Sequence, residues 1–167
     1  MITKEYLEKI YKVKNIIRYN NKLKLTHESV AEHSFFVSLI TIKICEEYDL
    51  PDEIVFKCVL KSLLHDMPEM DINDITHDAK EVLNLRGVLK KYEDKFYIEN
   101  FKKYANLMMD DSDDIVNAIV SYSDALSVRQ YIDCELSLGN NTKEILEIDA
   151  EIDKRIKKLK THLEGLL

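Results

Sequence analysis

Four ionisable side chains occupy positions where a helical protein is expected to bury apolar residues. They are His33, His65, Asp66 and Asp124, and they belong to three separate segments with helical periodicity. An unpaired buried charge costs on the order of several kcal/mol, so each of them needs a partner. Two imidazoles and two carboxylates suit a divalent cation such as Mn, Co, Fe or Ni, and tolerate Zn or Mg. One shared metal ion explains all four, and it leaves coordination positions for water and a substrate oxygen.

Each of these residues also has a simpler explanation. His33 lies in an apolar row and fits a hydrogen-bonded core histidine. Asp124 stands at the centre of a row with an apolar residue every four positions from 116 to 132, where it could pair with a neighbouring helix or cap a kinked one. The doublet His65-Asp66 ends an apolar helix, where a histidinium interacts favourably with the helix dipole. Spacing alone leaves these alternatives open.

The elements that must position these side chains are helices. Apolar periodicity predicts helices over about residues 3–17, 29–48, 51–66, 78–104, 110–138 and 142–164. Ser29 and Glu32 have the spacing of a capping box, and Gly139 supplies a helix stop. We expect a loop over residues 67–77 and a bend near Gly87. The fold class is therefore all-α: a compact bundle of about six helices with a central metal site, in which residues 1–167 form a single domain.

Composition excludes several classes of function. The chain has 167 residues, of which 46% are hydrophobic, and only 3 are Gly and 2 are Pro, which argues against disorder and against turn-rich β folds. The net charge of -7 disfavours binding to duplex nucleic acid, because phosphate neutralisation needs clustered Lys and Arg. No apolar run reaches the ~20 residues of a membrane span, so no membrane partner is expected. The charged N-terminus does not look like a signal peptide, and the three widely spaced cysteines fit a reducing cytoplasm.

The ordered pattern His33, His65-Asp66 and Asp124 resembles that of the HD-domain phosphohydrolases. The surrounding sequence is similar to the bacterial 5′-deoxynucleotidase branch of that superfamily in RY at 18–19, HESVAEHS at 27–34, HDMPE at 65–69, SDAL at 123–126 and ELSLGN at 135–140. This resemblance covers about residues 10–140. It implies an all-helical bundle with one central metal, Co or Mn by preference, that hydrolyses deoxyribonucleoside 5′-monophosphates. It also implies a homodimer or larger homo-oligomer.

The resemblance assigns roles to further residues. Glu69 and Asp66 would be catalytic, with Glu69 positioning the water and handling protons. Arg18 would bind the phosphate, for which a guanidinium fork is well suited. Tyr19 stands where the family often has Trp, beside the 2′ position of the sugar. Asp74 would bind the 3′-hydroxyl of the deoxyribose.

Two more residues are candidates for the substrate site. Lys61 lies one turn before His65 and could reach a phosphate, although a solvated lysine is the simpler interpretation. His77 could support the site from the loop that follows the doublet.

Two other functions stay open at this point. A related branch of the superfamily removes triphosphate from deoxynucleotides, and the four proposed ligands do not separate the two reactions. A non-catalytic nucleotide-binding helical module is the remaining alternative, although such a module has no use for Glu69.

Overall fold

The computed structural model describes residues 2–167, except for the side chains of residues 77 and 78. The all-α expectation is confirmed, because within this described part the only β pairing is one isolated bridge between Ile17 and Ser29. The helices are α1 (Lys4–Tyr11), the 3-10 helix η1 (Lys12–Asn15), α2 (Val30–Glu47), α3 (Asp52–Leu64), α4 (Glu69–Ile72), α5 (His77–Val82), α6 (Arg86–Asn100), α7 (Ala105–Met109), α8 (Asp114–Ser137) and α9 (Lys143–Leu166).

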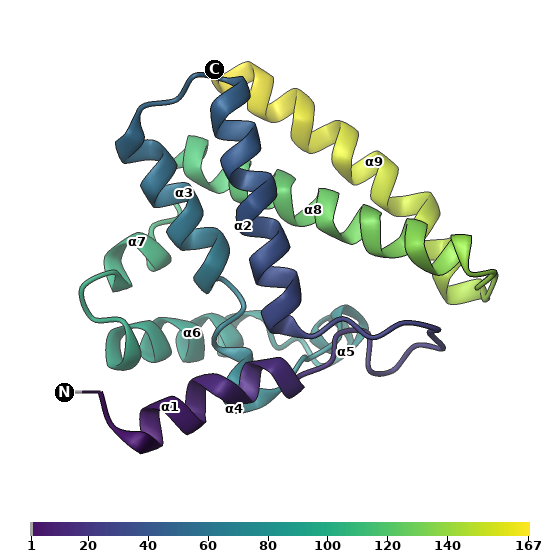
Figure 1. The fold of residues 1–167 in the computed structure, drawn as a ribbon, viewed down its shortest axis with the longest axis horizontal. Coiled ribbons are helices and arrows are strands. Elements are labelled where there is room, and N and C mark those ends of the chain that lie inside the picture. Colours follow the sequence, from purple (N-terminus) through teal and green to yellow (C-terminus); the bar gives the residue numbers. More distant parts are fainter. Residues whose placement is uncertain (1) are drawn as a thin grey trace.

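Helix α2 runs through the middle of the molecule and packs against both α3 and α8 (Figure 1). Helix α9 lies along α8, as expected for two long helices joined by a short turn. The predicted capping box fixes the start of α2: the Ser29 hydroxyl accepts from the backbone of Glu32 at 3.2 Å, and the Glu32 carboxylate accepts from the backbone of Ser29 at 2.8 Å. The cap orients the first turn of α2, which carries His33.

Apolar side chains fix the relative positions of these helices. One cluster joins α2, α3, α8 and the end of α9 through Ile44, Cys58, Ile119 and Leu163. A second cluster joins the later part of α8 to α9 and includes Ile132 and Ile145. Burial of such side chains contributes roughly 1.5–3 kcal/mol each. The three segments that carry the four candidate ligands are thus held in one packed unit.

The chain between α3 and α8 differs from the expectation. The predicted helix over 78–104 is two helices, and the turn between them places Asn84 in the left-handed region at φ 51°. The predicted bend near Gly87 corresponds to this turn, which lies at residues 83–85, and Gly87 itself is the second residue of α6. The predicted loop over 67–77 contains the single turn α4. Periodicity misses α4 and α7, because four or five residues are too few to establish a repeat.

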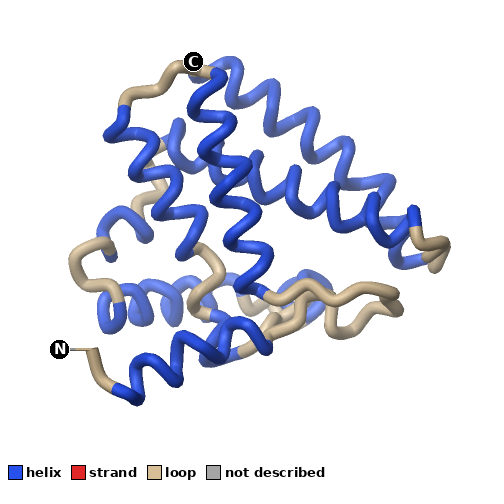
Figure 2. Tube along the Cα trace, in the orientation of Figure 1, coloured by secondary structure: helices blue, strands red, loops and turns tan. Residues whose placement is uncertain are grey.

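Loops gather beside the N-terminal end of α2 (Figure 2). The long segment between η1 and α2 lies near the chain that leads into α5, and the backbone N–H of Tyr19 donates to the Asp74 carboxylate at 3.1 Å. Backbone bonds from Arg18 to Glu28 and from Val30 to Ile16 close the base of the long loop. Within the described residues, no helix is both long enough and apolar enough to cross a membrane.

Candidate metal and substrate site

The two histidines and the first aspartate come together at the end of α3 and the start of α2. One ligand atom from each of His33, His65 and Asp66 lies within 4.8 Å of the others. The Nε2 atom of His33 is 3.7 Å from Oδ2 of Asp66, and Nε2 of His65 is 3.3 Å from the same oxygen. Asp124 of α8 joins them, because its Oδ1 lies 3.2 Å from Nε2 of His33. The tertiary structure therefore places all four candidate ligands in one cluster.

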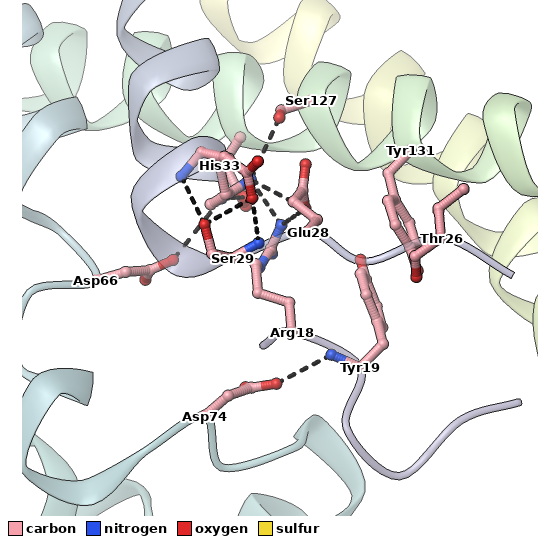
Figure 3. Close-up of polar contacts among 12 residues, drawn as sticks. Arg18, Tyr19, Thr26, Glu28, Ser29, His33, Asp66, Asp74, Ser127 and Tyr131 are labelled. Atoms are coloured by element: carbon pink, nitrogen blue, oxygen red, sulfur yellow. Dashed lines mark hydrogen bonds and ion pairs between the residues drawn. The ribbon is translucent and has the colours of Figure 1, made fainter. Parts of the chain in front are cut away.

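Both imidazoles direct Nε2 toward the carboxylates. The Nδ1 atom of His65 lies 2.6 Å from the carbonyl oxygen of Ser62, which can only accept, so Nδ1 carries a hydrogen and Nε2 is the ring nitrogen that faces the cluster. Nδ1 of His33 lies 3.2 Å from the Ser127 hydroxyl and 2.6 Å from Nη1 of Arg18 (Figure 3). The bond from His65 to a carbonyl oxygen is of the kind that orients metal-binding histidines, whereas Nδ1 of His33 accepts from Arg18, because a guanidinium can only donate.

The cluster contains a buried polar atom that lacks a hydrogen bond. His33 is fully buried, and its Nε2 has no hydrogen-bond partner of acceptable geometry despite its two carboxylate neighbours. Oxygen atoms of Asp66 and Asp124 approach this nitrogen, so nitrogen and oxygen donors converge on one place. The nitrogen and oxygen donors and this unpartnered atom fit a divalent cation. His33, His65, Asp66 and Asp124 are the residues that could hold it.

Electrostatics within the cluster keep both aspartates ionised. Burial would raise the pKa of Asp66, but the neighbouring His65 outweighs it and holds this pKa well below its usual range. Burial opposes ionisation of Asp124 too, and its contact with His33 and the charges of His65 and Arg155 lower its pKa. Burial would lower the pKa of His65, whereas Asp66 raises it to about 9.

Glu69 lies just beyond the doublet, at the start of α4. Burial raises its pKa to about 9, and the nearby carboxylates of Asp66 and Asp74 add to the shift. Its Oε2 is buried without a hydrogen-bond partner. A carboxyl group that is protonated near neutral pH and faces a charged cluster is suited to transferring protons.

Arg18, Tyr19 and Asp74 form the next part of the site. Nη1 of Arg18 also contacts the Glu28 carboxylate at 2.8 Å. Tyr19 has φ 54° and stacks flat on Tyr131 of α8, with ring centroids 4.9 Å apart (Figure 3). The left-handed backbone turns the Tyr19 ring onto α8, while its N–H holds Asp74 in place.

These residues border one large cavity of about 790 Å³, within the range of small-molecule sites. His65, Asp66, Glu69 and Asp124 line its polar end, and Arg18, Tyr19 and Asp74 line it as well. His33 lies beneath this surface. Helix α9 supplies a further wall through Ile148, Glu151, Ile152 and Arg155. The cavity can thus hold a polar group at the cluster and an apolar ring beside Tyr19.

Lys61 does not belong to this cavity. Its side chain is buried, and its Nζ donates to the carbonyl oxygen of Asp110 at 2.8 Å and to the side chain of Asn117 at 2.6 Å. Lys61 is thus neither a phosphate contact nor a solvated lysine, because its side chain links α3 to the start of α8. The prediction failed because one turn of separation from His65 does not determine which way a long side chain points. The side chain of His77 lies outside the described residues.

Three contributors to the site were missed from the sequence. Tyr131 lies two helical turns beyond Asp124, and no motif in the sequence distinguishes it from the other apolar residues of its helix. Glu135 is fully buried and accepts from the backbone of Leu25 and Thr26 at 2.8 and 2.7 Å, so it holds the long loop that carries Tyr19. Arg155 donates from Nη2 to Oδ2 of Asp124 at 2.7 Å. No local signal identifies it, because α9 is rich in charged residues throughout.

The comparison with protein families agrees with this geometry. The model of the YfbR-like 5′-deoxynucleotidases matches residues 5–164. The chain belongs to this family. The resemblance in the HD motif and its flanks is confirmed, and the protein is a metal-dependent deoxynucleotide phosphohydrolase. No curated protein matches the chain.

Solved structures share the fold of this YfbR-like protein. An HD-domain phosphohydrolase from Listeria innocua is 22% identical with a TM-score of 0.76, covering 95% of this chain and 82% of the other. A protein from Pyrococcus horikoshii is 24% identical with a TM-score of 0.76, covering 98% and 95%. The cyanophage S-2L HD phosphohydrolase DatZ, solved with dA and one catalytic Zn2+ ion, is 14% identical with a TM-score of 0.70, covering 99% and 95%. At these identities the likeness establishes the HD-domain fold.

Proposed function

We propose that this protein hydrolyses deoxyribonucleoside 5′-monophosphates to a deoxynucleoside and inorganic phosphate. The observation that carries the proposal is the cluster of four candidate ligands beside a cavity that also presents Arg18, Tyr19 and Asp74. An anionic group fits the cluster end, and a sugar and base fit the part bordered by Tyr19. The family match supports the same reaction.

His33, His65, Asp66 and Asp124 are the proposed ligands of one divalent cation, with Co or Mn preferred. When bound, such a cation neutralises phosphate charge and lowers the pKa of water. The catalytic Zn2+ ion of DatZ supports a divalent metal in a protein of this fold and keeps Zn among the candidates. The Nδ1 contacts of the two histidines hold both rings with Nε2 directed into the cluster.

Glu69 is the proposed proton carrier. Its raised pKa keeps a proton on the carboxyl group near neutral pH, so it can donate to the leaving 5′-oxygen and later take a proton from water. Asp66 belongs to the catalytic set through its place between the two histidines and its effect on the pKa of Glu69. Uncatalysed hydrolysis of phosphate monoesters is extremely slow, so charge neutralisation and proton transfer are both required.

Three residues are proposed to bind the nucleotide. Arg18 contacts the phosphate, Asp74 the 3′-hydroxyl, and the Tyr19 ring the 2′ side of the sugar. Tyr19 is held by its stack on Tyr131, which gives the cavity a fixed wall at this point. A fixed ring excludes a ribose 2′-hydroxyl better than a mobile one.

The test is a screen of deoxy- and ribonucleoside mono-, di- and triphosphates with Co, Mn, Zn and Mg, with products separated by chromatography. We expect inorganic phosphate from deoxynucleoside monophosphates, dependent on Co or Mn. Release of intact tripolyphosphate from deoxynucleoside triphosphates, with no reaction of monophosphates, would replace this proposal by triphosphate hydrolysis. Binding of deoxynucleotides without turnover under any metal would leave the non-catalytic module.

We also propose that the protein is a homodimer or larger homo-oligomer. Helix α2 exposes Phe35, Leu39 and Ile42 on one face, at 55%, 48% and 37% of their surface, and such an apolar stripe is typical of an interface. Light scattering coupled to size exclusion tests this, and a monomeric mass would contradict it. We further propose that residues 1–167 form a single domain. The protein is also proposed to work in a reducing cytoplasm, which its three free cysteines support.

A further inference from the structure

Arg155 occupies an unusual position on α9. Its guanidinium reaches across from α9 to α8 and donates to Oδ2 of Asp124, the oxygen opposite the one that lies near His33. It also lines the same cavity as Glu69 and His65. Its side chain is 49% exposed, so the group can leave the carboxylate for another anion at little desolvation cost.

The other arginine of the cavity is more constrained. The Arg18 side chain is only 15% exposed, and its Nη1 contacts both the Glu28 carboxylate and Nδ1 of His33. Among the described residues, Arg155 forms a hydrogen bond with one side chain, that of Asp124. Of the two guanidinium groups beside the cluster, that of Arg155 is thus the more accessible to a ligand in the cavity.

We propose that Arg155 binds the phosphate of the substrate as a second guanidinium, opposite Arg18. The inference rests on the proposed function, because it places the phosphate at the cluster end of the cavity. A divalent cation on Asp124 would compensate the carboxylate charge that now attracts Arg155. A phosphate dianion in the cavity then offers the guanidinium two oxygens that match its planar fork.

The charges around the cavity support this role. Its walls carry the carboxylates of Asp66, Asp74, Asp124 and Glu151, which together repel a phosphate group, whereas the carboxyl group of Glu69 is protonated near neutral pH. Arg155 is the basic residue that α9 contributes to the cavity wall. A cation on the α9 side gives an incoming nucleotide a favourable contact where Glu151 would otherwise repel it.

The experiment compares Arg155→Gln, Arg155→Lys and the unmodified protein, each loaded with cobalt. Arg129→Gln is the matched control, because Arg129 also bridges α8 to α9, with Asp149 at 2.6 Å, but does not line the cavity. Calorimetry measures the binding of inorganic phosphate and, separately, of deoxyadenosine, which lacks the phosphate. Elemental analysis gives the metal content, and KM and kcat are measured for a deoxynucleoside monophosphate.

We expect Arg155→Gln to weaken phosphate binding and raise KM by about tenfold or more, with deoxyadenosine binding and metal content unchanged. Arg155→Lys should recover part of the phosphate binding, since it keeps the charge without the fork. Arg129→Gln should bind phosphate like the unmodified protein.

Three results would overturn the inference. Phosphate binding by Arg155→Gln that equals that of the unmodified protein removes the contact. Loss of cobalt from this variant makes Arg155 a positioning residue for Asp124 instead. An equal loss of deoxyadenosine binding shows a general disturbance of the cavity. Failure of the proposed reaction itself is separate, because it would appear as absent turnover in the unmodified protein, while the calorimetric comparison still tests Arg155.

Discussion

Helix α8 carries two carboxylates in very different surroundings. Glu135 is fully buried and accepts hydrogen bonds from the backbone of Leu25, from the backbone and hydroxyl of Thr26, and from Asn140. Asp124 lies beside His33, whose Nε2 has no hydrogen-bond partner, and a second carboxylate is within 3.7 Å of that same nitrogen. Donors of the chain itself form all the hydrogen bonds to the Glu135 carboxylate, whereas the cluster around Asp124 contains a nitrogen that has no hydrogen-bond partner.

This difference separates a structural link from a functional site. Four donors around Glu135 stabilise the ionised form, so its pKa falls to about 2 although burial alone would raise it. That arrangement fixes the long loop against α8 without any further group. The Asp124 cluster instead concentrates ligand atoms beside a cavity, as expected for a place where a cation and a substrate complete the contacts.

The largest expected effect is that of Asp124→Ala. We expect this variant to lose its metal and at least about 1,000-fold in turnover, because a ligand is missing from a small donor set. The metal-free variant should also lose about 3 kcal/mol in the free energy of unfolding, because Arg155, His33 and His65 lose the carboxylate that compensates them. Elemental analysis and urea unfolding measure both. A metal content that equals that of the unmodified protein would remove Asp124 from the ligand set.

Glu69→Gln tests the proton-transfer step while leaving the proposed metal ligands intact. We expect turnover to fall about 100- to 1,000-fold while folding and metal content stay unchanged, because the amide cannot exchange a proton. Steady-state kinetics, circular dichroism and elemental analysis give the three values. A variant that retains full turnover would exclude Glu69 as the proton carrier.

Glu135→Gln tests the structural role of the buried carboxylate that holds the long loop against α8. The amide replaces a charged acceptor with a weaker one and presents an N–H to donors, so we expect a loss of about 2–3 kcal/mol in the free energy of unfolding. Metal content should not change, because Glu135 lies outside the cluster. Urea unfolding measures the loss, and equal stability of the two proteins would contradict the structural role.

The same residue predicts a pH dependence. The folded pKa of Glu135 is about 2, against an ordinary value of 4.5, so its contribution to stability is fully present above pH 4.5 and is lost as the pH falls toward 2. The unmodified protein should lose stability over this range more steeply than Glu135→Gln. If the free energies of unfolding of the two proteins fall in parallel from pH 5 to pH 2.5, Glu135 is not the group that causes the loss of stability.

The smallest effect concerns the wall beside the sugar. Tyr131→Phe keeps the stack on Tyr19 and removes only a long hydrogen bond to Thr26. The free energy of unfolding and the activation free energy from kcat/KM should therefore each change by less than about 1 kcal/mol. Tyr131→Ala removes the stack, and we expect the preference for deoxy- over ribonucleotides to fall about threefold or more. The ratio of kcat/KM for dAMP and AMP measures this preference. An unchanged ratio in Tyr131→Ala would show that the stack does not set the selectivity.

The sequence by itself determined the long helices, the cap at Ser29 and the ordered set of His33, His65-Asp66 and Asp124. These features follow from spacings of a few residues or from a motif, and local geometry does not depend on the rest of the chain. The six helices of eight residues or more agree with the expected six, whereas the one-turn elements were too short to leave a pattern.

Only the tertiary structure decided which distant residues meet. The contacts of Arg155 with Asp124, of Glu135 with the loop at Thr26, and of Lys61 with Asn117 join positions 31, 109 and 56 residues apart in the chain. Such contacts depend on how α2, α3, α8 and α9 pack, and on the direction that long side chains take from them. A helical period shows which face of a helix is buried, but the neighbour that covers this face is set by the packing of the whole chain.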